Sequence, residues 1–161
     1  MHAVANPQLQ AWTPGLQPAG AGRLTWWGLQ AYDARLWVAP GFRHRRFEQH
    51  AFALELTYAR AFSGADIASR SLEEMRRAGP LAEQDAARWR EQLRALLPDV
   101  RPGDRITGVH QPQAGARFLL NGKPLGEIAD PQFATRFFGI WLAPGTSAPE
   151  LRAALLAGTP P

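Results

Sequence analysis

A ten-residue alternating segment leads directly into a capped helix, and this junction limits the folds that the chain can adopt. Residues 51–60 read AFALELTYAR, in which Phe52, Leu54, Leu56 and Tyr58 alternate with small or polar residues. A period of two is typical of a strand that buries one face. The following residues, AFSGADIASRSLEEMRR, have the period of an amphipathic helix. The segment therefore predicts a half-buried strand followed by a helix that packs on a sheet.

Arg60 has the same parity as the apolar residues of this strand. In a regular strand its guanidinium points toward the core beside the Tyr58 hydroxyl. A buried charge costs several kcal/mol unless it is paired or hydrogen-bonded. Two interpretations stay open. In the structural one, Arg60 leaves the core at the strand end or forms an ion pair with Asp33 or Glu74. In the functional one, Arg60 and Tyr58 together hold the carboxylate of a ligand in a pocket.

The composition is that of a globular protein and excludes several classes of function. A chain of 161 residues is long enough for one domain with a two-layer core. No stretch approaches the roughly 18 apolar residues of a membrane span. Cysteine is absent and the four histidines lack short ligand spacing, so no metal site is expected. Nucleotide-binding and nucleophile motifs are also missing, and we expect no cofactor.

The positive net charge of +4 does not indicate a nucleic-acid partner. Only the residues Arg43, His44, Arg45 and Arg46 form a basic cluster. A nucleic-acid surface would need basic residues interleaved with exposed aromatic residues on one face. The cluster is therefore predicted to be a solvated loop between strands.

The order of the predicted elements is strands, two helices, strands and two helices, which indicates an α+β fold with an antiparallel sheet. Residues 1–21 are predicted to be an extended N-terminal lead-in and residues 22–158 the folded domain. Strands are expected over 23–38 with a bend at Gly28, over 51–60, over 104–112, and over 116–128 with a turn at Asn121-Gly122. Helices are expected after a Ser63–Asp66 cap, over 81–97, from Asp130-Pro131, and after a Ser147–Glu150 capping box.

The helix after Ser63 has two distinct sets of residues near the sheet. The predicted apolar stripe consists of Ala65, Ala68, Leu72 and Met75. Along one edge of this stripe lie Ile67, Ser71 and Glu74.

Five pieces of the chain resemble, in order and spacing, the bacterial chalcone isomerase-like proteins. These pieces are GLQAYDARLWV, LELTYARAFSGADIASRSLEEM, PGDRITGV, ARFLLNGKPLGEI and FATRFFGIWLAPGTS, within residues 23–157. The resemblance implies the chalcone isomerase fold, a large antiparallel sheet covered by a layer of helices with a ligand cleft between them. It also implies relatives that range from plant flavonoid enzymes to non-catalytic proteins that bind fatty acids or haem. Bacterial members often carry a secretion leader, which implies a periplasmic or secreted location.

The resemblance also implies roles for individual positions. The enzymes add a phenolate to an enone within one molecule, and arginine, tyrosine, threonine and asparagine side chains stabilise the developing enolate. In this chain the arginine position corresponds to Arg23, if a gap is allowed, and the threonine position to Trp27. The tyrosine and asparagine positions correspond to Ile67 and Glu74, and a later hydroxyl position corresponds to Phe138. Because the helix edge lacks the tyrosine and the asparagine, we do not expect chalcone cyclisation and assign no catalytic residue.

The sequence thus predicts a non-catalytic protein that binds a small amphipathic carboxylate, such as a fatty acid, in a cleft between sheet and helices. The candidate ligand-binding residues are Arg23, Trp27, Tyr58, Arg60, Ile67, Ser71, Glu74 and Phe138. Two alternatives stay open: an isomerase or lyase that acts on an enone, and a ligand-free periplasmic interaction module with a filled core. Structural interpretations compete at Arg23, as an exposed strand-start charge, and at Ser71, as a hydroxyl bonded to its own helix. Tryptophans such as Trp141 are interpreted as core.

Overall fold

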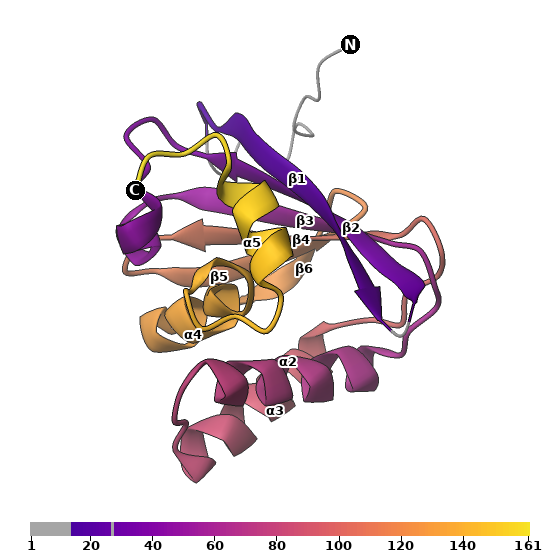
Figure 1. Ribbon diagram of the computed structural model, residues 1–161. Coiled ribbons are helices and arrows are strands. Elements are labelled where there is room, and N and C mark those ends of the chain that lie inside the picture. Colours follow the sequence, from indigo (N-terminus) through magenta and orange to yellow (C-terminus); the bar gives the residue numbers. More distant parts are fainter. Residues whose placement is uncertain (1–13, 27) are drawn as a thin grey trace.

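A six-stranded antiparallel sheet forms the scaffold of the protein, for which a computed structural model describes residues 14–26 and 28–161 (Figure 1). The strands lie side by side in chain order: β1 (Gln17–Trp26), β2 (Leu29–Val38), β3 (Phe52–Tyr58), β4 (Arg105–Gln111), β5 (Gly115–Leu120) and β6 (Lys123–Ile128). Each strand pairs with its neighbour in the antiparallel sense. The predicted α+β class with a large antiparallel sheet is confirmed.

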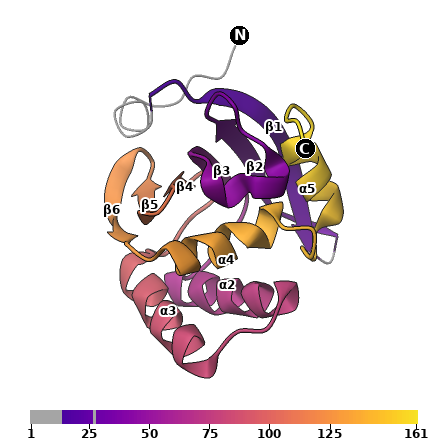
Figure 2. The ribbon, with the colours of Figure 1, turned by 90° about the vertical axis from the view of Figure 1, so that its left-hand side faces the viewer.

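The helices cover one face of this sheet in two layers. They are the 3₁₀ helix η1 (His44–Gln49) and the α-helices α2 (Gly64–Ala78), α3 (Glu83–Leu96), α4 (Pro131–Leu142) and α5 (Pro149–Leu156). Helices α4 and α5 lie against the strands, whereas α2 and α3 pair with each other and α2 packs on α4 (Figures 1 and 2). Within the described residues, no helix combines the length and the apolar composition that crossing a membrane requires.

The turns and strand starts follow local chemistry, with one boundary that differs from the sequence prediction. Asn121 and Gly122 both have positive φ, at 51° and 84°, and join β5 to β6 as predicted. The first strand begins at Gln17 rather than at Arg23. β1 is an edge strand, so Pro18 interrupts no hydrogen bonds to a further strand on its outer side. A register shift between Pro18 and Gly20 accommodates the proline ring on the side that pairs with β2.

One predicted helix cap is confirmed and another is wrong. The Ser63 hydroxyl accepts a hydrogen bond from the Asp66 amide at 3.0 Å and caps α2. The capping box predicted for Ser147 and Glu150 does not form, because α5 begins with no side-chain cap. The Ser147 hydroxyl instead donates to the Glu74 carboxylate of α2. A long-range bond therefore takes the place of the local one.

Two further details of the helical layer differ from the sequence prediction. Ala65 of α2 is exposed, and Ser71 occupies a buried position beside Ala68, Leu72 and Met75. The basic residues Arg43–Arg46 form the N-cap and the first three residues of η1 rather than a loop, although the arginines are exposed as expected.

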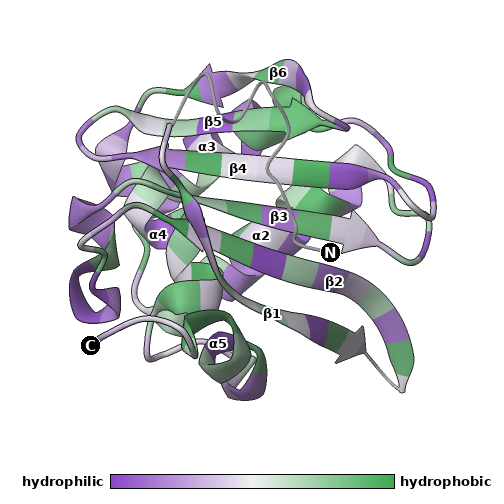
Figure 3. Cartoon of the chain, turned by 90° about the horizontal axis from the view of Figure 1, so that it is seen from above, coloured by the Kyte–Doolittle hydropathy of each residue, from purple (hydrophilic) through white to green (hydrophobic). Residues whose placement is uncertain are grey.

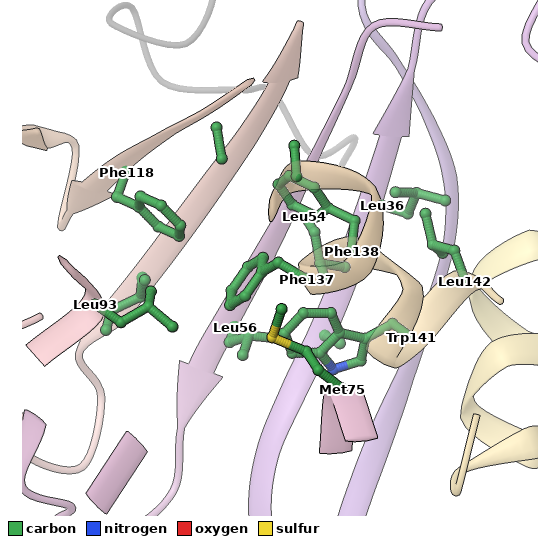
Figure 4. Close-up of a cluster of buried hydrophobic side chains, with 14 of the residues drawn as sticks. Leu36, Leu54, Leu56, Met75, Leu93, Phe118, Phe137, Phe138, Trp141 and Leu142 are labelled. Carbon is green, nitrogen blue, oxygen red and sulfur yellow. The ribbon is translucent and has the colours of Figure 1, made fainter. Parts of the chain in front are cut away.

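The main core lies between the sheet and the helices (Figure 4). Its largest fully buried side chains are Trp89, Phe52, Phe118, Phe133, Phe138, Leu36, Leu72, Met75, Leu93 and Leu142. The opposite face of the sheet shows hydropathy that alternates along the strands (Figure 3). A smaller buried cluster on that face consists of Leu16, Trp37, Ala53, Val109 and Leu119.

Candidate functional site

A cavity of about 650 Å³ lies between the sheet, α2 and α4. Leu56, Ile106 and Phe118 form its floor on three adjacent strands. Further apolar lining residues come from the strand ends, the helices and the connecting segments: Leu24, Phe62, Ile67, Leu97, Phe137, Ile140, Trp141 and Ala148. Both its volume and its apolar lining are those of small-molecule binding sites.

Charged side chains of α2 surround one part of this cavity. They are Asp66, Arg70, Glu73, Glu74 and Arg77, and all except Glu74 are exposed. The Glu74 carboxylate lies 3.5 Å from the Arg77 guanidinium and accepts the Ser147 hydrogen bond, so it joins α2 to the segment before α5. An apolar interior with a charged rim suits a ligand that has one polar end and one apolar end.

Two tyrosines on neighbouring strands provide the polar groups of the inner wall. Tyr32 of β2 and Tyr58 of β3 are partners in the strand register, and their rings meet edge to face with centroids 5.8 Å apart. Both side chains line the cavity and are nearly buried, with exposed fractions of 6% and 5%. Trp141 of α4 donates its indole N–H to the Tyr32 hydroxyl oxygen at 2.9 Å. This bond connects the helical layer to the sheet at the cavity wall.

The environment keeps both phenols protonated. Burial raises the pKa of Tyr32 to about 12, against the opposing effect of the Trp141 hydrogen bond. Burial also raises the pKa of Tyr58, and the neighbouring Tyr32 adds to that rise. Among the rim charges, Glu74 raises and Arg70 lowers the pKa of Tyr32. These phenols can donate or accept hydrogen bonds near neutral pH, but they do not act as bases.

The structure brings four of the eight candidate residues into the cavity wall: Tyr58, Ile67, Ser71 and Glu74. The Ser71 hydroxyl donates to the Ile67 carbonyl at 2.7 Å, which is the bond to its own helix that competed with a ligand role. Contact of these four residues with a ligand stays a prediction.

Both candidate arginines lie outside the cavity wall. β3 ends at Tyr58, and the Arg60 guanidinium is exposed and donates through Nε to the Gln30 carbonyl at 3.2 Å. The interpretation that Arg60 points into the core is therefore wrong, because the strand ends before its parity can apply. Arg23 is also exposed, and its Nε lies 2.9 Å from a carboxylate oxygen of Asp33. It has the surface role that competed with ligand binding.

Phe138 is part of the core rather than of the cavity wall. Its side chain is fully buried, and its ring meets Phe52 edge to face at 4.9 Å. The ring lies over Gly108, where an added Cβ would come within 3.0 Å of it. Trp27 lies outside the described residues.

The sequence analysis did not select three residues that the structure places at this site: Tyr32, Arg70 and Trp141. Tyr32 could have been found, because antiparallel pairing of two apolar faces places it opposite Tyr58. Arg70 lies one turn from both Ile67 and Glu74 on α2, but a wheel places it among the solvent-facing residues. Trp141 was interpreted as core, and only the long-range bond to Tyr32 reveals its second role.

Comparisons with known proteins agree with this architecture. The family profile described as chalcone isomerase-like matches residues 16–157. An uncharacterized protein of Haemophilus influenzae is 28% identical over 143 residues, which cover 89% of this chain and 69% of that protein. The crystal structure of the Arabidopsis thaliana fatty-acid binding protein AtFAP1 matches with a TM-score of 0.69 and 9% identity, covering 88% of this chain and 87% of the plant chain. At this identity the structural match shows a shared fold.

Proposed function

The chain belongs to the chalcone isomerase-like family, and we propose that it binds a small amphipathic carboxylate, such as a fatty acid, in the cavity beside α2. One observation carries this proposal: a mainly apolar cavity of about 650 Å³ has a charged rim in which two guanidinium groups, those of Arg70 and Arg77, lie among the carboxylates of α2. The printed name of the plant relative, a fatty-acid binding protein, points to the same class of ligand.

Arg70 is the residue best placed to hold the acid end. Its side chain lines the cavity from α2, and its charge lowers the pKa of the Tyr32 phenol on the inner wall. Arg77 also lines the rim and lies 3.5 Å from Glu74. A guanidinium that meets a carboxylate forms charge-assisted hydrogen bonds, which are stronger than neutral ones. The acyl chain then extends over Leu56 and Ile106 on the floor.

The two other interpretations have less support. A ligand-free interaction module predicts a filled core, which the cavity does not fit. An enone isomerase of the family type needs hydroxyl and amide donors where α2 has Ile67 and Glu74. Turnover of a chalcone above its spontaneous rate would favour the enzyme, and it is measured by loss of the chalcone absorbance.

Two measurements test the proposal directly. Native mass spectrometry of the purified protein should show a co-purified acid, and calorimetry with saturated fatty acids from octanoate to stearate should show binding that strengthens with chain length. The length dependence arises because each buried CH₂ contributes roughly 0.8 kcal/mol. Absence of heat and of a thermal shift with every acid would reject the proposal.

Arg70→Gln and Arg60→Gln form a matched pair for locating the acid end. Both residues are exposed arginines, but only Arg70 lines the cavity. Arg70→Gln should weaken binding of a fatty acid by roughly threefold to tenfold, as expected for a partly solvated charge pair. Arg60→Gln should leave the affinity at the wild-type value. Equal losses in both variants would indicate only a general effect of net charge.

A further inference from the structure

The Tyr58 hydroxyl is a hydrogen-bonding group in a wall that is otherwise mostly apolar. Within the part of the chain that the structure describes, no residue forms a hydrogen bond with it. Its side chain is only 5% exposed, and it lines the cavity beside Leu56 and Phe62. Among the described residues, the fully buried side-chain polar atoms without a partner are Trp37 Nε1 and His44 Nδ1, so the Tyr58 oxygen itself stays accessible from the cavity. There a water molecule or a polar group of a ligand can form a hydrogen bond with it. The cavity is the place from which such a partner can come.

From this we propose that the Tyr58 hydroxyl recognises a neutral oxygen atom, a hydroxyl or a keto group, part-way along the acyl chain of the ligand. The inference rests on the proposed function and narrows its ligand class from plain fatty acids to oxygenated ones.

The charge distribution favours a neutral oxygen over a carboxylate at this position. Arg23 and Arg60 lie outside the wall, and the guanidinium groups of Arg70 and Arg77 belong to exposed side chains of α2 at the rim. A carboxylate that moved from the rim to Tyr58 would give up both its water and these exposed arginines, which is unfavourable. A hydroxyl or keto oxygen accepts one hydrogen bond from a neutral phenol and carries no such cost. The acid end therefore stays at the rim near Arg70.

The neighbouring residues hold the Tyr58 ring in place for this contact. Its ring is in edge-to-face contact with Tyr32 at 5.8 Å and with Phe62 at 5.6 Å. Tyr32 is itself fixed by the hydrogen bond from Trp141 at 2.9 Å. A donor held in position before binding discriminates better between ligands than a mobile one, because less ordering accompanies binding.

A matched ligand series tests the proposal on the wild-type protein. Calorimetry would compare stearate with monohydroxy and keto stearates that carry the oxygen at successive positions, and with methyl-branched stearates as controls for shape. One oxygen position should bind roughly threefold to tenfold more tightly than plain stearate, the gain expected for one neutral hydrogen bond. Methyl branches should give no gain at that position.

Tyr58→Phe identifies the residue responsible. This variant keeps the ring and its contacts, and it should abolish the preference for the oxygenated acid while binding plain stearate somewhat more tightly. If wild-type protein binds plain and oxygenated acids equally, or if the variant retains the preference, the inference is overturned and the fatty-acid function stands. If no acid of either kind binds, the proposed function fails together with the inference.

Discussion

The same face of the sheet supports two regions with opposite packing, and the difference between them locates the site. We call the packed half the cluster of Phe42, Phe52, His110 and Phe138. Its rings are in close contact, with centroids 4.6 Å apart for Phe52 and His110, and 4.9 Å apart for Phe52 and Phe138. We call the hollow half the cavity lined by Tyr32, Tyr58 and the side of α2. One sheet thus carries a filled core and a space for a ligand.

The two helices that cover the halves account for this difference. α4 lies against the strands, and its Phe137, Phe138 and Trp141 extend into the core (Figure 4). Gly108 makes room for Phe138 there. α2 packs mainly on α3 and α4, and its cavity-lining side has Ser71 and Glu74, whose side chains are short or bonded elsewhere. These two side chains therefore leave space open above Leu56 and Ile106.

The largest expected effect is the loss of stability when Phe138 is truncated. Phe138→Ala removes a fully buried ring from the packed half, and it should lower the free energy of unfolding by about 3–5 kcal/mol. Ile67→Ala in the hollow half should cost about 1 kcal/mol or less, because Ile67 is half-exposed and already borders empty space. Denaturant unfolding of both variants measures the contrast. Similar losses in the two would show that the halves are packed alike.

Alkaline pH should destabilise the hollow half through its phenols. The pKa of Tyr32 is raised from 10.0 to about 12 and that of Tyr58 is raised further. Between about pH 10 and 12, each of these phenols keeps its proton in the folded chain and loses it in the unfolded chain. The free energy of unfolding therefore falls as pH rises, by about 1.4 kcal/mol per pH unit for each such group. Denaturant unfolding across this range measures the fall, with Tyr58→Phe expected to reduce it. An unchanged slope in Tyr58→Phe would contradict burial of that hydroxyl.

Gly108→Ala should disturb mainly the packed half, because the new Cβ would crowd Phe138 but would meet Phe118 of the cavity floor at an ordinary contact distance of 3.7 Å. The new Cβ would lie 3.0 Å from Cε1 of Phe138 and 3.1 Å from its Cζ, so the ring or α4 must shift. We expect a loss of about 1–2 kcal/mol in the free energy of unfolding, as for overpacking elsewhere. The double variant with Phe138→Leu should lose less than the sum of the two single losses, because the smaller side chain relieves the clash. Losses that simply add in the double variant would show that the clash is not the cause.

The sequence predicted the fold better than it predicted the site, and the reason is the range of the interactions involved. The β3 alternation, the Ser63 cap and the Asn121-Gly122 turn depend on residues close in the chain, and each is confirmed. The cavity depends instead on how far α2 stands from the sheet, which no local pattern encodes. Arg60 shows the limit most clearly, because one bend after Tyr58 moves its guanidinium to the surface.

The smallest expected effect is an acid-dependent loss that belongs to the packed half. The Nδ1–H of His110 donates to the His50 carbonyl at 2.7 Å, and its ring stacks on Phe52. Burial lowers the pKa of His110, and neither the carbonyl nor the nearby Glu48 charge offsets that effect. The unfolded chain therefore takes up a proton at His110 before the folded chain does. Stability from this group is present above the unfolded pKa and falls as pH drops through about 6.5 and below.

His110→Gln should flatten this acid limb in denaturant unfolding between about pH 7 and 4. His50→Gln keeps the carbonyl that accepts the His110 bond and removes only the His50 charge, a minor contribution to the lowered pKa of His110, so it should flatten the limb much less. The Tyr58→Phe variant should show the wild-type acid limb, since its hydroxyl titrates only in alkali. The two halves would then be separated by pH as well as by packing, with acid acting on one and alkali on the other. An acid limb that persists in His110→Gln would show that protonation of another group, outside this aromatic cluster, governs stability at low pH.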